Sequence, residues 1–234
     1  MLDISKIRAI GLDLDDTLWP IWPTIERAEA QLQQWLAQRA PAAARLFCEP
    51  AARLRLREQV LALRPDLDHD MSSVRRECIR LALRQSDEDT GLAEPAFEVF
   101  FEHRMRVDLF ADVLPALRFL AARYPLVAIS NGNADVQRVG LAAHFTASMS
   151  AHQLGVGKPD ARIFHAAAAA AGVPAEQVLH VGDDPMLDIL GGLNAGMQTV
   201  WVNRLDHAWK HEARPHASVT DLHQLCGLLE GRAP

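Results

Sequence analysis

The fold is decided at residues 7–17, which read Ile-Arg-Ala-Ile-Gly-Leu-Asp-Leu-Asp-Asp-Thr. The first part of this stretch is short and largely apolar, and it runs directly into carboxylates, which is typical of a buried parallel strand. Comparable apolar runs follow at residues 126–129, 178–181 and 199–202, with a weaker one at 145–149. We therefore expect a parallel sheet with acidic side chains at the end of its first strand.

Helical patterns separate these predicted strands. Apolar spacing predicts a helix over residues 114–124. Six consecutive alanines predict another over residues 162–171, because alanine is the best helix former and Gly172 follows as a stop signal. Strands that alternate with helices imply right-handed crossovers and helices on both faces of the sheet. The sequence thus predicts a doubly wound α/β core.

The segment from residue 20 to residue 107 follows a different pattern. It shows no strand pattern, and its apolar residues have helical spacing at 28–37, 53–63, 74–83 and 97–105. Pro20 and the change of pattern near Asp108 mark its boundaries. We predict an α/β core from residues 1–19 and 108–234, with residues 20–107 as a helical insertion.

Composition limits the classes of partner. The chain has 234 residues and 49% hydrophobic content, enough to bury a full core. A net charge of -6 and a pI near 5.9 give no general attraction to nucleic acid or to an anionic membrane surface, so a small-molecule partner is expected. Scattered cysteines, no signal-peptide pattern and no apolar run of about 20 residues predict a cytoplasmic protein.

The first acidic pair suits phosphoryl transfer. Asp13 and Asp15 stand where the first predicted strand ends, so both can face one ligand. An ionised Asp can attack phosphorus while a second carboxyl donates a proton to the leaving oxygen, and a bound Mg²⁺ offsets the negative charge. Aspartates are also common in turns and helix caps, so this pair alone leaves both interpretations open.

Three further polar motifs follow predicted strands or lie in adjoining loops. One holds a hydroxyl and amides that suit phosphate oxygens, one holds a lysine, and one holds carboxylates that suit Mg²⁺. They are Ser130-Asn131-Gly132-Asn133, Gly157-Lys158-Pro159-Asp160 and Gly182-Asp183-Asp184-Pro185-Met186-Leu187-Asp188. Each alone also fits a turn, a surface lysine or an acidic helix start. Their shared placement at strand ends predicts a single site.

Taken together, the four motifs resemble those of the haloacid dehalogenase-like hydrolase superfamily. The matching stretches are DLDDT at 13–17, SN at 130–131, K at 158 and GDDPMLD at 182–188. The resemblance covers nearly the whole chain. It implies a Rossmann-like core with an inserted α-helical cap that closes over the site.

The resemblance also implies a role for each matched residue. Asp13 is expected to be the nucleophile and Asp15 the general acid and base, with Ser130 and Lys158 holding the phosphate. Asp13, the backbone carbonyl of Asp15 and Asp183 are the implied Mg²⁺ ligands. The further residues expected around the substrate or the metal are Asn131, Thr17 and Trp19 for substrate, and Asp184 and Asp188 for ordering metal waters or Lys158.

Two aromatic residues and one arginine leave alternatives open. Trp19 or Trp22, close after the acidic pair, could stack on a planar flavin-like ring, since indole offers a broad apolar face. The alternative is packing at the hinge, because large aromatic residues are usually buried. Arg204 follows the last predicted strand, where a solvated loop position is expected and substrate contact is the alternative.

Asp15 points to the reaction. Dehalogenases of the resembled superfamily lack a carboxylate two residues after the nucleophile and need no metal, so phosphoryl transfer is favoured.

The stretches DLDDTLW, VAISNGN, LHVGDD and GMQ look like those of bacterial phosphatases acting on FMN and on 5-amino-6-(5-phosphoribitylamino)uracil. The implied activity is Mg²⁺-dependent hydrolysis of a small phosphomonoester through an aspartyl-phosphate. A phosphomutase acting on sugar phosphates and a catalytically silent phospho-ligand-binding protein are the alternatives.

Overall fold

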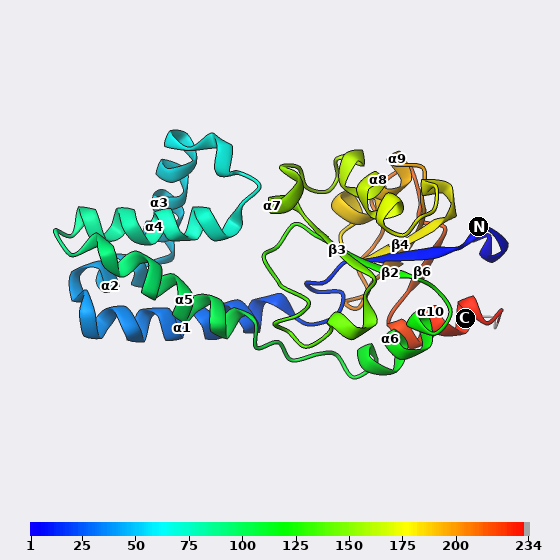
Figure 1. Ribbon diagram of the computed structural model, residues 1–234, viewed down its shortest axis with the longest axis horizontal. Coiled ribbons are helices and arrows are strands. Elements are labelled where there is room, and N and C mark those ends of the chain that lie inside the picture. Colours follow the sequence, from blue (N-terminus) through cyan, green and yellow to red (C-terminus); the bar gives the residue numbers. More distant parts are fainter. Residues whose placement is uncertain (232–234) are drawn as a thin grey trace. The chain divides into compact units, whose positions relative to one another are not determined.

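The computed structural model describes residues 1–231 and forms two compact units (Figure 1). The first unit combines Met1–Pro20 with Asp108–Pro234, and the second is Ile21–Val107. The predicted insertion, residues 20–107, differs from the second unit only at Pro20. None of the helices within residues 1–231 combines the length and apolar character that a bilayer crossing requires.

The first unit is built on a six-stranded parallel sheet in the order β3-β2-β1-β4-β5-β6. The strands are β1 Ala9–Leu12, β2 Leu126–Ser130, β3 Ala147–Ser150, β4 Val178–Gly182, β5 Gln198–Val202 and β6 Ala217–Val219. The predicted parallel α/β sheet is therefore confirmed, with β1 between β2 and β4. The sequence analysis did not predict β6, whose three residues are too few to show a strand pattern.

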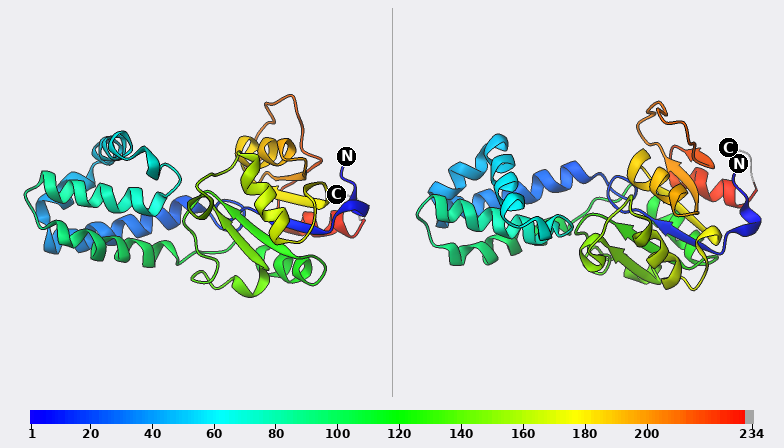
Figure 2. Two further views of the ribbon diagram at one scale, coloured as in Figure 1. Left: turned by 45° about the horizontal axis from the view of Figure 1, so that its top comes forward. Right: turned by 90° about the horizontal axis from the view of Figure 1, so that it is seen from above.

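Helices cover both faces of this sheet (Figures 1 and 2). They are α6 Val113–Ala121, α7 Ala151–Leu154, α8 Ala161–Ala170, α9 Gly191–Asn194 and α10 Leu222–Leu229, with a π-helical segment at Pro185–Leu190. The helices α8 and α9 lie on one face and α6 and α10 on the other. The alanine-rich helix packs Ile163 and Phe164 against Ala9 and Val127, so this face of the sheet is closed by apolar contacts.

The second unit contains only helices, as predicted. They are α1 Ile21–Arg39, α2 Pro41–Cys48, α3 Pro50–Leu63, α4 Met71–Gln85 and α5 Ala93–Arg104. Leu32 and Leu36 of α1 belong to one apolar core with Phe97 and Phe100 of α5. Pro23 lies in the first turn of α1, where its missing N–H leaves no helical hydrogen bond unmade.

A mostly buried arginine side chain connects distant segments of the first unit. The Arg204 guanidinium donates to both carboxylate oxygens of Asp112 at 3.2 and 2.8 Å and to the Thr17 carbonyl at 2.9 and 3.3 Å. It also lies 4.0 Å above the ring centre of Phe110, and Asp112 accepts the backbone N–H of Leu222 at the start of α10. The expectation of a solvated loop arginine was wrong, because only 14% of the Arg204 side chain is exposed.

We expect Arg204→Met to lower the free energy of unfolding by about 3 kcal/mol, because it leaves the mostly buried Asp112 carboxylate without its cation. Urea unfolding followed by circular dichroism measures the change. Arg214→Met, which removes an exposed arginine, is the matched control and should have little effect. Equal stability of the two variants would contradict the structural role of the Arg204 contacts.

Candidate active site

The parallel register brings the predicted motifs to one edge of the sheet. Leu12 lies opposite Ala128 of β2 and Val181 of β4, and the backbone N–H of Asp13 donates to the Val181 carbonyl at 2.9 Å. The residues that follow these strand positions therefore emerge side by side. This is the carboxyl edge, where parallel α/β sheets hold their ligands.

A buried lysine joins two of the predicted carboxylates. Lys158 donates through Nζ to Asp13 Oδ1, and to Asp188 Oδ1 at 2.7 Å. The three residues are 5%, 6% and 1% exposed, respectively, so this ammonium and these carboxylates are removed from water together. Burial alone would lower the pKa of Lys158, but the two carboxylates outweigh burial and raise it. Lys158 is therefore a fixed positive charge beside Asp13.

The acidic groups differ in pKa because their partners differ. Burial raises the pKa of Asp13 well above its usual value despite Lys158, with Asp188 and Asp183 adding to the rise. Burial would also raise the pKa of Asp188, but Lys158 and His180 outweigh it and lower that pKa to about 2. Asp188 is thus ionised, whereas burial and the two acidic neighbours disfavour the charged form of Asp13, and Lys158 favours it.

Asp183 and Thr17 complete this cluster. The Thr17 hydroxyl, fully buried, lies 3.0 Å from Asp183 Oδ1 and 3.3 Å from Asp13 Oδ2. It was expected to contact substrate, and the structure places it as a bridge between two carboxylates. Burial and the neighbouring Asp188 raise the pKa of Asp183 to about 7.

The cluster has the chemistry of a divalent-cation site. One carboxylate oxygen from each of Asp13, Asp183 and Asp188 lies within 4.8 Å of the other two. Hard oxygen donors are the ligands that Mg²⁺ prefers, and the single ammonium of Lys158 cannot balance three carboxylates. Asp188 accepts three hydrogen bonds, from Lys158, His180 and the Asp184 N–H, so Asp13 and Asp183, the two ligands that the resemblance implies, are the side chains that would hold the ion. The residues present fit Mg²⁺.

The end of β2 and the loop after it carry Ser130 and Asn131, and Asn131 contacts the Lys158 main chain. The Ser130 hydroxyl is 3% exposed and accepts the Gly132 backbone N–H at 3.0 Å, which leaves its proton to be donated. The Asn131 side-chain amide makes two hydrogen bonds with the Lys158 main chain: it donates to the carbonyl at 2.8 Å and accepts from the N–H at 2.7 Å. Its side chain, expected to bind substrate, thus holds the lysine loop in place.

Trp19 is a partner of the predicted general acid. Its side chain is completely buried, and its indole Nε1 donates to Asp15 Oδ1 at 2.8 Å. No face of the Trp19 ring is exposed for stacking on a substrate, which corrects that expectation in favour of packing. Trp22, in α1 of the helical unit, is 70% exposed.

The two remaining acidic predictions have different surroundings. Asp188 holds Lys158, as the resemblance allowed. The Asp184 carboxylate instead accepts the backbone N–H groups of Met186 and Leu187 at 2.7 and 2.8 Å, and so caps the π-helical segment. The ordering of metal waters by Asp184 stays a prediction.

Two contributing residues were missed by the sequence analysis. His180 on β4 is fully buried and lies with Nε2 2.8 Å from Asp188 Oδ1, and burial lowers its pKa despite that carboxylate. Trp201 on β5 donates through Nε1 to the Asp183 carbonyl at 2.7 Å. A polar residue inside the apolar run 178–181 was the available signal for His180.

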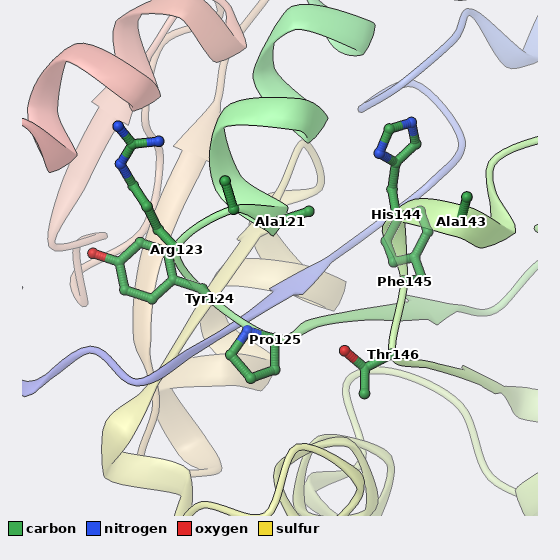
Figure 3. Close-up of a pocket in the computed structure, with 9 residues that line it drawn as sticks. Ala121, Arg123, Tyr124, Pro125, Ala143, His144, Phe145 and Thr146 are labelled. Atoms are coloured by element: carbon green, nitrogen blue, oxygen red, sulfur yellow. The ribbon is translucent and has the colours of Figure 1, made fainter.

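A hollow of about 430 Å³ lies at the opposite, amino-terminal edge of the sheet (Figure 3). It is lined by residues that precede β2 and β3, among them Arg123, Tyr124 and His144. None of the clustered carboxylates or Lys158 contributes to it. The chemistry therefore belongs to the carboxyl edge and not to this hollow.

Comparison with known proteins agrees with this placement. The model of the haloacid dehalogenase-like hydrolase family matches residues 7–196, a span that includes every clustered residue described above. The chain belongs to this family of hydrolases and is an enzyme. The predicted membership is thereby confirmed.

One curated relative and two solved structures are similar to the chain over nearly its whole length. The chain is 32% identical to the 5-amino-6-(5-phospho-D-ribitylamino)uracil phosphatase YigB of Escherichia coli (strain K12), over 97% of this chain and 98% of that protein. It is 40% identical to a crystal structure of 2-haloacid dehalogenase from Pseudomonas syringae pv. Tomato DC3000, with a TM-score of 0.90 and 96% and 99% coverage. A phosphatase structure from Thermococcus onnurineus shares the fold at a TM-score of 0.69, 22% identity and 97% and 99% coverage.

Charge removal at Asp183 should stabilise the metal-free protein. The pKa of Asp183 is about 7 when folded and 3.8 in its ordinary state, so the folded carboxyl keeps a proton that the unfolded chain releases between these values. Stability from this group is therefore lost as the pH rises from about 4 to 7. We expect Asp183→Asn to have a higher melting temperature than the wild type at pH 8, and each kcal/mol of gained stability should raise that temperature by about 2–4 °C. The difference should shrink towards pH 4.

Differential scanning fluorimetry with EDTA and with Mg²⁺ measures both effects. Mg²⁺ should raise the midpoint of the wild type more than that of Asp183→Asn, since the variant lacks one ligand. Asp206→Asn, which removes an exposed carboxylate, controls for the loss of one charge. A lower midpoint for Asp183→Asn than for wild type at pH 8 without metal would contradict the prediction.

Proposed function

We propose that this protein is a Mg²⁺-dependent phosphatase that hydrolyses a small phosphomonoester through an aspartyl-phosphate on Asp13. The observation that carries the proposal is the buried contact of Lys158 with Asp13 inside a cluster of carboxylates. A carboxylate nucleophile beside a fixed cation suits an incoming phosphate, because the ammonium lowers the repulsion between two anions. Ser130, with a hydroxyl proton to donate, supplies a second contact for the phosphate oxygens.

The reaction takes two steps at this site. Asp13 attacks phosphorus in line with the ester bond, which breaks as the Asp13–phosphorus bond forms, and Asp15 gives its proton to the leaving oxygen. Asp15 then takes a proton from water, which attacks the phosphorus and releases inorganic phosphate and the Asp13 carboxylate. Trp19 supports this exchange, since its N–H fixes the orientation of the Asp15 carboxylate.

Mg²⁺, held by Asp13, Asp183 and, as the resemblance implies, the backbone carbonyl of Asp15, would neutralise charge on the transferring phosphoryl group. Two sets of hydrogen bonds hold the carboxylates of Asp13 and Asp183 in position. Thr17 bridges Asp13 and Asp183, and Trp201 fixes the Asp183 main chain through its carbonyl. Both contacts preorganise the two carboxylates before substrate binds.

A 2-haloacid dehalogenase is the second candidate, because a structure described by that name is 40% identical to this chain. The same Asp13 could displace a halide from carbon. A halide leaves without a proton, however, so Asp15 would have no partner in that step. The three clustered carboxylates also suit a divalent cation, which would offset the charge of a phosphate ester and has no role in displacing a halide. These arguments favour phosphate esters.

The substrate we propose is 5-amino-6-(5-phosphoribitylamino)uracil or FMN, on the strength of the 32% identity to YigB over nearly its full length. Both pair a phosphomonoester with a planar ring system. We place the activity in the cytoplasm, where a riboflavin-pathway phosphatase would work.

Asp13→Asn should lower kcat for an aryl phosphate by about 1000-fold or more, because an amide cannot form the acyl phosphate. Phosphate release from p-nitrophenyl phosphate measures it, with EDTA expected to abolish wild-type activity and added Mg²⁺ to restore it. Asp16→Asn is the matched control in the same loop: Asp16 has a φ of 57°, which Asn tolerates, and most of the activity should survive. Intact turnover by Asp13→Asn would disprove the nucleophile.

A substrate panel should separate the candidate activities. We expect phosphate release from FMN and from the ribitylamino-uracil phosphate, and no halide release from 2-chloropropionate. Sugar phosphates that isomerise without net phosphate release would instead identify a phosphomutase, and binding without turnover a silent ligand-binding protein.

A further inference from the structure

His180 is a buried polar residue that the reaction steps above do not use. It occupies the middle of β4, Val178–Gly182, where every residue is buried. Its Nε2 lies 2.8 Å from Asp188 Oδ1, while its Nδ1 has no hydrogen-bond partner among residues 1–231. The same Asp188 oxygen accepts from the Lys158 ammonium, so it acts as an acceptor and the imidazole proton is assigned to Nε2.

The neighbouring strand makes room for this imidazole. Gly11 of β1 pairs in register with His180, and a Cβ at position 11 would lie 3.1 Å from His180 Nδ1 and 2.8 Å from Ile129 Cδ1. The ring also meets Phe164 of α8 edge to face, with ring centres 5.0 Å apart. The sheet therefore holds the histidine in one orientation, aimed at Asp188.

Asp188 passes this orientation on to Lys158. Its Oδ1 accepts from His180 and from Lys158 Nζ, and its Oδ2 accepts the Asp184 backbone N–H at 3.1 Å. Its carboxylate crosses so close to Gly182 that a Cβ there would lie 2.2 Å from Asp188 Cγ. The chain His180–Asp188–Lys158–Asp13 is thus continuous and almost completely buried.

We propose that His180 is a positioning residue for phosphate binding: through Asp188, its Nε2–H holds the Lys158 ammonium where the phosphoryl oxygens arrive beside Asp13. The inference rests on the proposed phosphatase function. Loss of this N–H leaves Asp188 with one donor fewer and the ammonium with a less fixed partner. At metal sites, mutating a residue that orients a ligand through a hydrogen bond typically lowers affinity or activity by about 10- to 100-fold, and we expect an effect of this size here.

Two variants separate the hydrogen bond from packing. In His180→Gln, an amide N–H can reach the place of Nε2, whereas His180→Leu fills a similar volume without a donor. We expect His180→Leu to weaken the binding of inorganic phosphate, measured by calorimetry with Mg²⁺, by about 10-fold and to lower kcat/KM to a similar extent. His180→Gln should stay close to wild type in both measurements.

Equal behaviour of the Gln and Leu variants, whether both are impaired or both intact, would overturn the proposal. If His180→Leu does not fold, His180→Asn replaces it, because its shorter amide cannot reach Asp188. Failure of all three variants to fold would assign His180 to packing alone and also overturn it. Phosphate binding by calorimetry does not depend on turnover, so a wild type that releases no phosphate from an ester defeats the proposed function and leaves this test valid.

Discussion

The ion pair between Lys158 and the two carboxylates Asp13 and Asp188 is the constraint on which the rest of the site depends. A buried ammonium is tolerated only when fully paired, and each carboxylate here would be equally costly without it. The pair forms only if the ends of β1 and β4 lie next to each other and the Lys158 loop reaches over them. The parallel order with β1 beside β4 is therefore a condition for the chemistry as well as a way to build a core.

The other contacts support this ion pair from different directions. Asn131 fixes the main chain of Lys158, His180 fixes Asp188, and Thr17 connects Asp13 with Asp183. Arg204 extends the support outward by holding the Thr17 carbonyl. Each is a polar side chain whose partner is a main-chain group or a buried carboxylate. The site is rigid because its hydrogen bonds converge on groups that cannot move without breaking several others.

The sequence was most informative where residue type and strand position coincided. Asp13 and Asp183 could be predicted because they follow buried apolar runs whose strands the sheet brings together, and Lys158 because its loop matches a motif of the resembled superfamily. The roles of His180 and Arg204 could not be predicted, because they depend on partners elsewhere in the chain. His180 contacts Asp188 and packs where Gly11 has no side chain, and Arg204 contacts Asp112 and Thr17. Trp19 was assigned to substrate since periodicity does not tell which side of a short loop is buried.

The carboxylates that make a charged Asp183 costly are also the groups that could hold a divalent cation. A cluster optimised for the stability of the chain alone would replace at least one of these carboxylates with a neutral group, and would then lose the ligand. The same reasoning bears on the reaction. The chain is 40% identical to a protein described as a dehalogenase and 32% identical to one described as a phosphatase, so overall identity does not decide between them. A carboxyl group at position 15 and a cluster of carboxylates that could hold a divalent cation would each have a use in cleaving a phosphate ester and none in releasing a halide.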